Sequence, residues 1–128
     1  PAMIRKFHEA KLNGNTLVEL WGTGSPMREF LHVDDLGEAV LFALENKLDE
    51  HLYNVGSGVD LTIKELAAII QVSIGHLGEI KWDSSKPDGT PRKLMDTSKL
   101  NKMGWSSKIN LETGIPEIYN WYKESGIK

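Results

Sequence analysis

The sequence contains no cysteine, which excludes a disulfide framework and a thiolate metal site and makes the cytoplasm the simplest expected location. It also lacks a basic excess: 15 lysines and arginines stand against 18 acidic residues, and the net charge is -3. Broad contact with nucleic acid or with an anionic membrane surface needs such an excess. No apolar run approaches the length that crosses a bilayer. We therefore expect neither nucleic acid nor a membrane among the partners.

What the sequence does contain is ordinary for one globular domain. Its 128 residues are 40% hydrophobic and 26% charged, which is enough for one core but little for a complete two-site enzyme. The first residue is Pro1 rather than methionine, and Pro1-Ala-Met-Ile resembles the first turn of a helix. We therefore expect the chain to begin inside a larger protein.

Strand patterns alternate with helix patterns along the chain, which predicts an α/β fold with short strands and about five helices. The expected helices are 1–13, 34–47, 62–75, 98–103 and one from residue 110 onward. The expected strands are 17–21, 30–33, 51–55 and 79–83. The most distinct signal is the capping box of Thr62 and Glu65.

The helix over 34–47 should be capped by Asp34 or Asp35, because a carboxylate at a helix start accepts free N–H groups and faces the positive end of the dipole. Its expected buried stripe is formed by Leu36, Val40, Ala43 and Leu44.

The first unusual segment is the turn Trp21-Gly-Thr-Gly-Ser-Pro-Met-Arg28. Its glycines and proline hold Arg28 beside the indole of Trp21. A planar guanidinium fits phosphate oxygens and an indole offers a stacking surface, so the pair suits a nucleotide. Taken alone, these residues fit a hairpin with a surface arginine equally well.

The second unusual segment is Lys86-Pro-Asp-Gly-Thr-Pro-Arg-Lys93, which carries Lys86, Arg92, Lys93 and the carboxylate of Asp88 on a backbone stiffened by two prolines. Such a loop could clamp a diphosphate, with Asp88 accepting hydrogen bonds from a sugar or a base. A solvated basic loop is the alternative.

Other motifs do not support a site. Gly22-x-Gly24 and Gly56-x-Gly58 are too short for a dinucleotide fingerprint. Tyr119-x-x-x-Lys123 has the spacing of a reductase pair, but Tyr119 lies on an apolar stripe, so we interpret it as a packing residue. The four histidines show no paired spacing, and we predict no metal site. Among the four histidines, only His32, which lies just before Asp34 and Asp35, is a candidate for a functional role.

The two unusual segments, with Glu29-Phe-Leu-His-Val-Asp-Asp35 and Tyr53-Asn-Val-Gly-Ser-Gly-Val-Asp60, resemble the GDP-L-fucose synthase family of extended short-chain dehydrogenases. This resemblance implies that residues 1–128 are a nucleotide-sugar substrate-binding domain from the C-terminal part of such an enzyme, without the Rossmann domain. The family is NADPH-dependent: it inverts C3 and C5 of GDP-4-keto-6-deoxy-D-mannose and reduces the C4 ketone.

The resemblance also implies the site. Three residues match positions that contact substrate in the family: Trp21, Arg28 and Asp88. Lys6 matches a position at which a basic residue also contacts substrate. Lys93 and Arg92 are expected near the diphosphate. The catalytic residues and the NADPH site belong upstream of Pro1, in the N-terminal Rossmann domain.

This implied division of the enzyme leads to further expectations. The chain alone should hold no catalytic, cofactor or metal residue, should be inactive, and should expose an apolar surface toward the missing domain. The intact enzyme is expected to be a homodimer. The alternatives are another nucleotide-sugar epimerase or dehydratase, or a stand-alone nucleotide-binding or interaction module.

Overall fold

The computed structural model describes residues 2–49 and 51–126, and the α/β class is confirmed in them. The described helices are α1 (Ala2–Leu12), α2 (Val33–Glu45), α3 (Ile63–Ile74), α4 (Ser98–Lys102) and α5 (Leu111–Glu124). The described strands are β1 (Leu17–Trp21), β2 (Met27–Glu29), β3 (Asp60–Thr62), β4 (Glu79–Asp83) and β5 (Arg92–Lys93). They form two small sheets, a parallel β1–β4 pair and a three-stranded sheet in the order β3-β2-β5.

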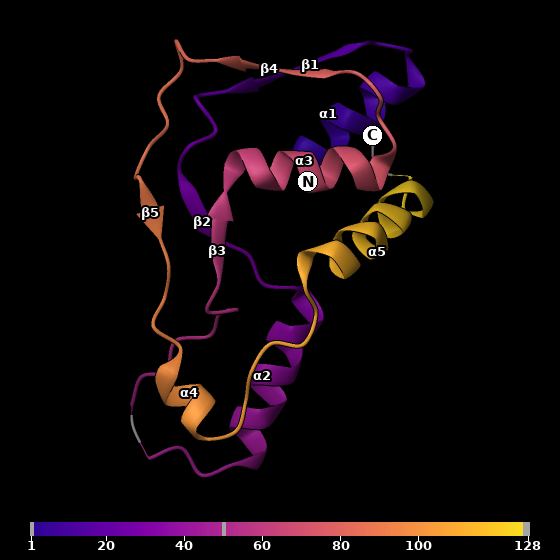
Figure 1. Cartoon of the computed structure of the whole chain (residues 1–128). Coiled ribbons are helices and arrows are strands. Elements are labelled where there is room, and N and C mark those ends of the chain that lie inside the picture. The colour runs from indigo at the N-terminus through magenta and orange to yellow at the C-terminus, as the bar shows by residue number, and fades with distance from the viewer. Residues whose placement is uncertain (1, 50, 127–128) are drawn as a thin grey trace.

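The main core lies between the β1–β4 pair and three helices. Along β1, Val18 and Leu20 are buried while their neighbours are exposed, as expected for a strand with one covered face. Helix α3 packs against both α1 and α5, and Figure 1 shows the β1–β4 pair along one side of α3 and α5 on the other. Phe7 and Ala67 are fully buried there.

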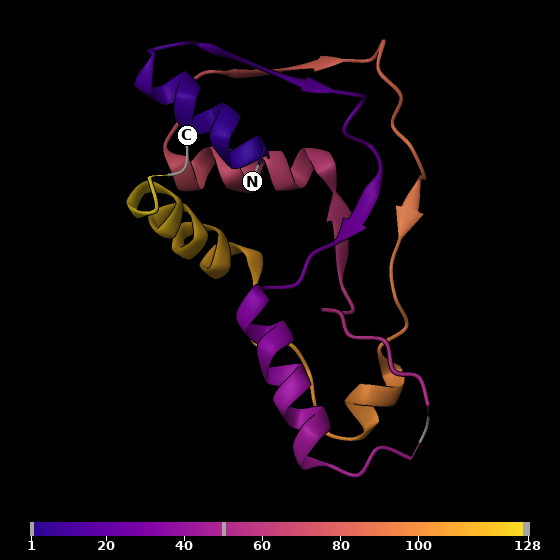
Figure 2. The ribbon, with the colours of Figure 1, turned by 180° about the vertical axis from the view of Figure 1, so that it is seen from behind.

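A second, smaller core lies at the opposite end of the molecule, where α2 and α4 stand apart from α1 and α3 (Figure 2). It consists of Ala39, Leu100 and Trp105 with a few half-buried neighbours. Asp35 is only 2% exposed at its edge, and its carboxylate accepts the backbone N–H groups of Lys108 and Ile109, both at 3.0 Å. This acid therefore joins the start of α2 to the segment that leads into α5.

Side-chain caps mark the starts of α2, α3 and α5. The capping box of Thr62 and Glu65 is confirmed, and α3 ends at Gly75 in a left-handed conformation with φ 73°. The Asn110 side chain accepts the N–H of Thr113 and begins α5 as expected. The prediction for α2 is wrong, because His32 and not an aspartate caps it by accepting the N–H of Asp34. Asp35 instead points inward.

Two strand predictions are wrong. The strand expected over 30–33 lies earlier, at Met27–Glu29, because the backbone pairs there with β3 and β5 before it turns into α2. The segment 51–55 is not a strand in the described chain, because no strand of either sheet lies next to it. Its Leu52 side chain is 73% exposed. Strands β3 and β5, which are only three and two residues long, were not predicted from the sequence.

The predicted buried stripe of α2 is also wrong. Leu36 is 47% exposed, Val40 53% and Leu44 78%. The buried residues of this helix are Asp35 and Ala39 instead. Since Leu41 is exposed as well, α2 carries an apolar surface that faces away from both cores. An exposed apolar surface is thus confirmed. No helix among the described residues is long and apolar enough to span a membrane.

Candidate functional site

The two unusual segments lie side by side because the strands on both sides of them pair. Strands β1 and β4 run parallel, with Trp21 opposite Asp83. The two segments that follow these strands therefore leave the first sheet at the same end. They pair again as β2 and β5, where Arg28 lies opposite Lys93. The predicted meeting of the Arg28 turn with the Lys93 loop is therefore confirmed.

Three contacts fasten the loop to the turn between these sheets. The Asp88 carboxylate accepts the backbone N–H and the hydroxyl of Thr23, each at 2.7 Å. Gly22 lies so close that a Cβ there would collide with the same carboxylate. Further along, the Met27 N–H donates to the Pro91 carbonyl at 2.8 Å. The hydrogen bonds from Thr23 lower the pKa of Asp88, so this side chain is an anion that closes the turn.

Cations and an indole lie along the joint, which is the contact between the turn 21–28 and the loop 86–93. Register partners in a parallel ladder point to the same face, so Arg28 and Lys93 share one face of the β3-β2-β5 sheet. The Arg28 guanidinium donates to the Met27 carbonyl at 2.6 Å. At the other end, the Lys86 ammonium lies 5.5 Å from the ring centre of Trp21, whose side chain is 68% exposed. The arrangement offers fixed positive charge and a free aromatic face.

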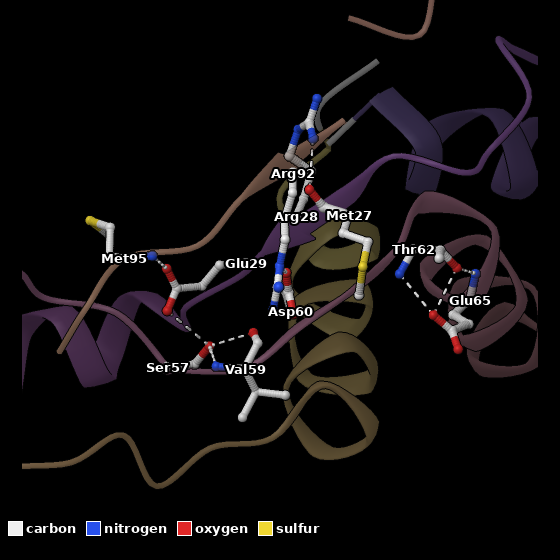
Figure 3. A network of polar contacts seen from close by, with 10 residues as sticks. All are labelled: Met27, Arg28, Glu29, Ser57, Val59, Asp60, Thr62, Glu65, Arg92 and Met95. Carbon is white, nitrogen blue, oxygen red and sulfur yellow. Dashed lines mark hydrogen bonds and ion pairs between the residues drawn. The ribbon is translucent and has the colours of Figure 1, made fainter. Parts of the chain in front are cut away.

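Arg92 points to the opposite face of the sheet, because it is the register partner of Met27. Its Nε and Nη2 donate to the Asp60 carboxylate at 2.6 and 3.1 Å. This ion pair lowers the pKa of Asp60 and raises that of Arg92. Figure 3 shows Arg28 and Arg92 extending in opposite directions from adjacent strands. Arg92 thus ties β5 to β3 across β2, and a contact with diphosphate stays a prediction.

Lys6 lies on α1, and its ammonium donates to the Glu19 carbonyl of β1 at 2.9 Å. Glu19 and Trp21 both belong to the exposed face of β1. Lys6 therefore lies beside the strand that carries the indole, at a shallow hollow of about 250 Å³ between α1 and β1.

Glu29 was not predicted as a site residue; it follows Arg28 on β2 and faces the other side of the sheet. Its carboxylate accepts the N–H groups of Gly58 at 2.6 Å and Met95 at 3.1 Å, and Ser57 donates its hydroxyl at 3.5 Å. Figure 3 shows Glu29 between Met95 and Ser57. The available signal was the alternation of a strand, which places residues 28 and 29 on opposite faces.

Neither glycine pair of the sequence provides a cradle for a dinucleotide in the described chain. Such a cradle leads from a strand into a helix N-terminus. The Gly22 and Gly24 turn leads into β2, and the Gly56 and Gly58 turn leads into β3. In addition, a Cβ on Gly24 would lie 2.7 Å from the Trp82 ring, so this glycine serves packing.

The reductase-like pair at Tyr119 and Lys123 is a packing feature, which confirms the interpretation from sequence. Tyr119 is 7% exposed, and its hydroxyl lies 3.0 Å from His8 Nδ1. Burial raises the pKa of Tyr119, whereas an acid-base tyrosine of this type needs a lowered one. No cluster of three or more potential metal ligands occurs among the described residues.

Known proteins are similar to this chain in sequence and in fold. Residues 1–56 match the NAD dependent epimerase/dehydratase family. Over 127 residues the chain is 55% identical to the probable GDP-L-fucose synthase 1 of Oryza sativa subsp. japonica, covering 99% of this chain and 39% of that protein. It is 44% identical to the GDP-L-fucose synthase of Escherichia coli (strain K12), covering 98% of this chain and 42% of the relative.

Among solved structures, the GDP-mannoheptose C4 reductase of Campylobacter jejuni with NADP bound superimposes with a TM-score of 0.84 at 39% identity. The match covers 96% of this chain and 44% of that one. The chain therefore spans less than half the length of these proteins and corresponds to their C-terminal portion.

Proposed function

Because this chain is a homologue of the C-terminal part of GDP-L-fucose synthases, we propose that it forms the GDP-sugar-binding domain of such an enzyme. In this proposal residues 1–128 bind GDP-4-keto-6-deoxy-D-mannose. The whole protein inverts C3 and C5 and reduces the C4 ketone with NADPH to give GDP-L-fucose.

The observation that carries this proposal is the pairing of Arg28 with Lys93 on one sheet face, beside the exposed indole of Trp21. Fixed cations stabilise a diphosphate that is already charged, so they supply binding energy without an acid or base of their own. The indole offers a stacking surface for guanine. Lys6, Asp88 and Arg92 remain predicted substrate contacts, with Asp88 and Arg92 already committed to Thr23 and Asp60.

We propose that NADPH binds to an N-terminal Rossmann domain, as the resemblance to the GDP-L-fucose synthase family implies. One solved relative carries NADP, which supports the cofactor but not its position. We further propose that this domain covers the apolar surface of α2, whose exposure fits such a neighbour. The resemblance further implies that the intact protein is a homodimer.

Calorimetric titration with GDP, UDP and dTDP tests the proposed ligand. We expect GDP to bind most tightly, and a preference for UDP would favour another nucleotide-sugar epimerase or dehydratase. Arg28→Ala should weaken GDP binding by about 1.5–3 kcal/mol, the cost of a lost charge-assisted contact. Arg5→Ala is the matched control, since Arg5 lies on α1 and forms an ion pair with its helix neighbour Glu9. Equal affinities of both variants would refute the clamp.

The division of labour has its own test. We expect the 128-residue chain by itself to oxidise no NADPH in the presence of the keto-sugar, while the protein with a Rossmann domain does. Turnover by the chain alone would refute the assignment of chemistry to that domain. Absence of GDP binding and turnover in both would favour a protein-interaction module.

A further inference from the structure

Glu29 links three segments that are distant in the sequence. It belongs to β2, and its two carboxylate oxygens accept N–H groups from Gly58, before β3, and from Met95, after β5. We propose that Glu29 is a positioning residue for the cation pair: it sets the register of β2 against β5 and thereby places Lys93 opposite Arg28. This inference rests on the proposed function, because the cation pair is the proposed diphosphate site.

The β2–β5 ladder needs such a fixation because it is very short. Only two register pairs join the strands, Met27 with Arg92 and Arg28 with Lys93. A slip by one residue would turn every side chain of β5 to the other face. Lys93 would then leave the face of Arg28.

Contacts at both ends of β5 oppose this slip. Before β5, the Met27 N–H donates to the Pro91 carbonyl at 2.8 Å. After β5, the Met95 N–H donates to Glu29 Oε2 at 3.1 Å. Arg92 adds its pair with Asp60 on the same face as Glu29. The hydrogen bond from Met95 to Glu29 therefore holds the end of β5 that follows Lys93.

The other oxygen of Glu29 is enclosed by the Gly56–Gly58 turn. Gly58 donates to Oε1 at 2.6 Å, and a Cβ on Gly56 would collide with the carboxylate. Both oxygens are therefore needed as acceptors. An amide in place of the carboxylate keeps its size but loses one acceptor, which leaves one backbone N–H without its partner.

Glu29→Gln separates positioning from simple electrostatics by the sign of its effect. Removing a negative charge near two cations should strengthen binding of a diphosphate if charge alone mattered. Loss of position should weaken it. We expect GDP binding to become about tenfold weaker in calorimetric titration, as for the loss of one hydrogen bond to a charged group. Glu38→Gln is the matched control, because this acid pairs with Lys108 away from the joint.

A double-mutant comparison tests whether Glu29 acts through Lys93. In a Lys93→Ala background, Glu29→Gln should weaken binding further by less than twofold, because the group that it positions is gone. An equal tenfold loss in both backgrounds would show a general structural effect and overturn the proposal. Unchanged or tighter binding by Glu29→Gln in the native background would also overturn it. Absence of GDP binding by the native protein would instead refute the proposed function.

A measurement on the native protein covers the case in which Glu29→Gln does not fold. If the β2–β5 register strengthens GDP binding at the cation pair, bound GDP must stabilise that register by the same free energy. We expect saturating GDP to slow hydrogen exchange of the Met95 amide by about tenfold, with little change at the Thr113 amide in α5. Unchanged exchange of Met95 in the presence of bound GDP would refute the inference.

Discussion

The buried carboxylate of Asp35 leads to the sharpest prediction about stability. Asp35 and Asp34 are neighbours in the first turn of α2, but their surroundings differ. Asp35 is 2% exposed and accepts two backbone N–H groups at 3.0 Å, whereas the Asp34 side chain is 73% exposed. Changing each aspartate to asparagine therefore compares the same chemical change in two environments.

The expected cost follows from these contacts. Asp35→Asn keeps one acceptor oxygen and turns an amide toward the other backbone N–H, so one charge-assisted hydrogen bond is lost, worth about 1.5–3 kcal/mol. Both variants also lose the attraction of a carboxylate to the helix N-terminus, worth about 0.3–1 kcal/mol. We therefore expect Asp35→Asn to lower the free energy of unfolding by about 2–4 kcal/mol and Asp34→Asn by less than about 1 kcal/mol.

Thermal unfolding followed by circular dichroism measures this difference. For a chain of this size, 1 kcal/mol corresponds to roughly 4 °C in Tm, so Asp35→Asn should lower Tm by roughly 8–16 °C. Urea unfolding with an unchanged m-value would show that the folded state itself has been destabilised. Equal Tm values for the two variants would refute the assignment of Asp35 as the tie between α2 and the segment before α5.

Three further predictions concern pH, packing and the surface of α2. The hydrogen bond from Arg92 lowers the pKa of Asp60 in the folded state, so the stability that Asp60 contributes is full above its unfolded pKa near 4 and is lost as pH falls through the folded pKa; Asp60→Asn should therefore flatten the loss of stability below about pH 4, and an unchanged slope in urea titrations would contradict this. Gly24→Ala should cost about 2 kcal/mol or more and clearly more than Gly14→Ala, because both glycines have a positive φ, +76° and +66°, but only a Cβ on Gly24 would meet the Trp82 ring; equal costs in urea unfolding would contradict the packing role. Leu44→Glu should change stability by less than about 0.5 kcal/mol and reduce self-association in light scattering, because this side chain is 78% exposed; a large loss of stability would contradict its exposed position.

Sequence reasoning succeeded where the determining contacts are local. The cap of α3 depends on Thr62 and Glu65, which lie one helical turn apart, and the cap of α5 depends on Asn110 and Thr113 in the same way. Such contacts form between near neighbours, so the pattern contains the information.

It failed where a distant partner decides. The position of β2 is set by its pairing with β3 and β5, and those partners are too short to show a strand pattern. His32 caps α2 because the backbone leaves the sheet only three residues earlier, and Asp35 is drawn inward by Lys108 and Ile109. Most of the apolar residues expected to be buried on α2 are exposed, because this helix packs through Asp35 and Ala39 instead.

For the candidate site, the meeting of Arg28 with Lys93 was predicted and is confirmed. The opposite direction of Arg92 was not, since it follows from the register and from Asp60. The role of Glu29 was missed for the same reason: its partners Gly58 and Met95 are far from it in the sequence.

The parallel course of β1 and β4 has a consequence for how this molecule can vary. Residues 84–91 leave one sheet beside Trp21 and enter the other beside Arg28, so both ends of the loop are held by backbone ladders. A substitution between those ends can therefore alter the surface beside Trp21 while both ladders stay in place.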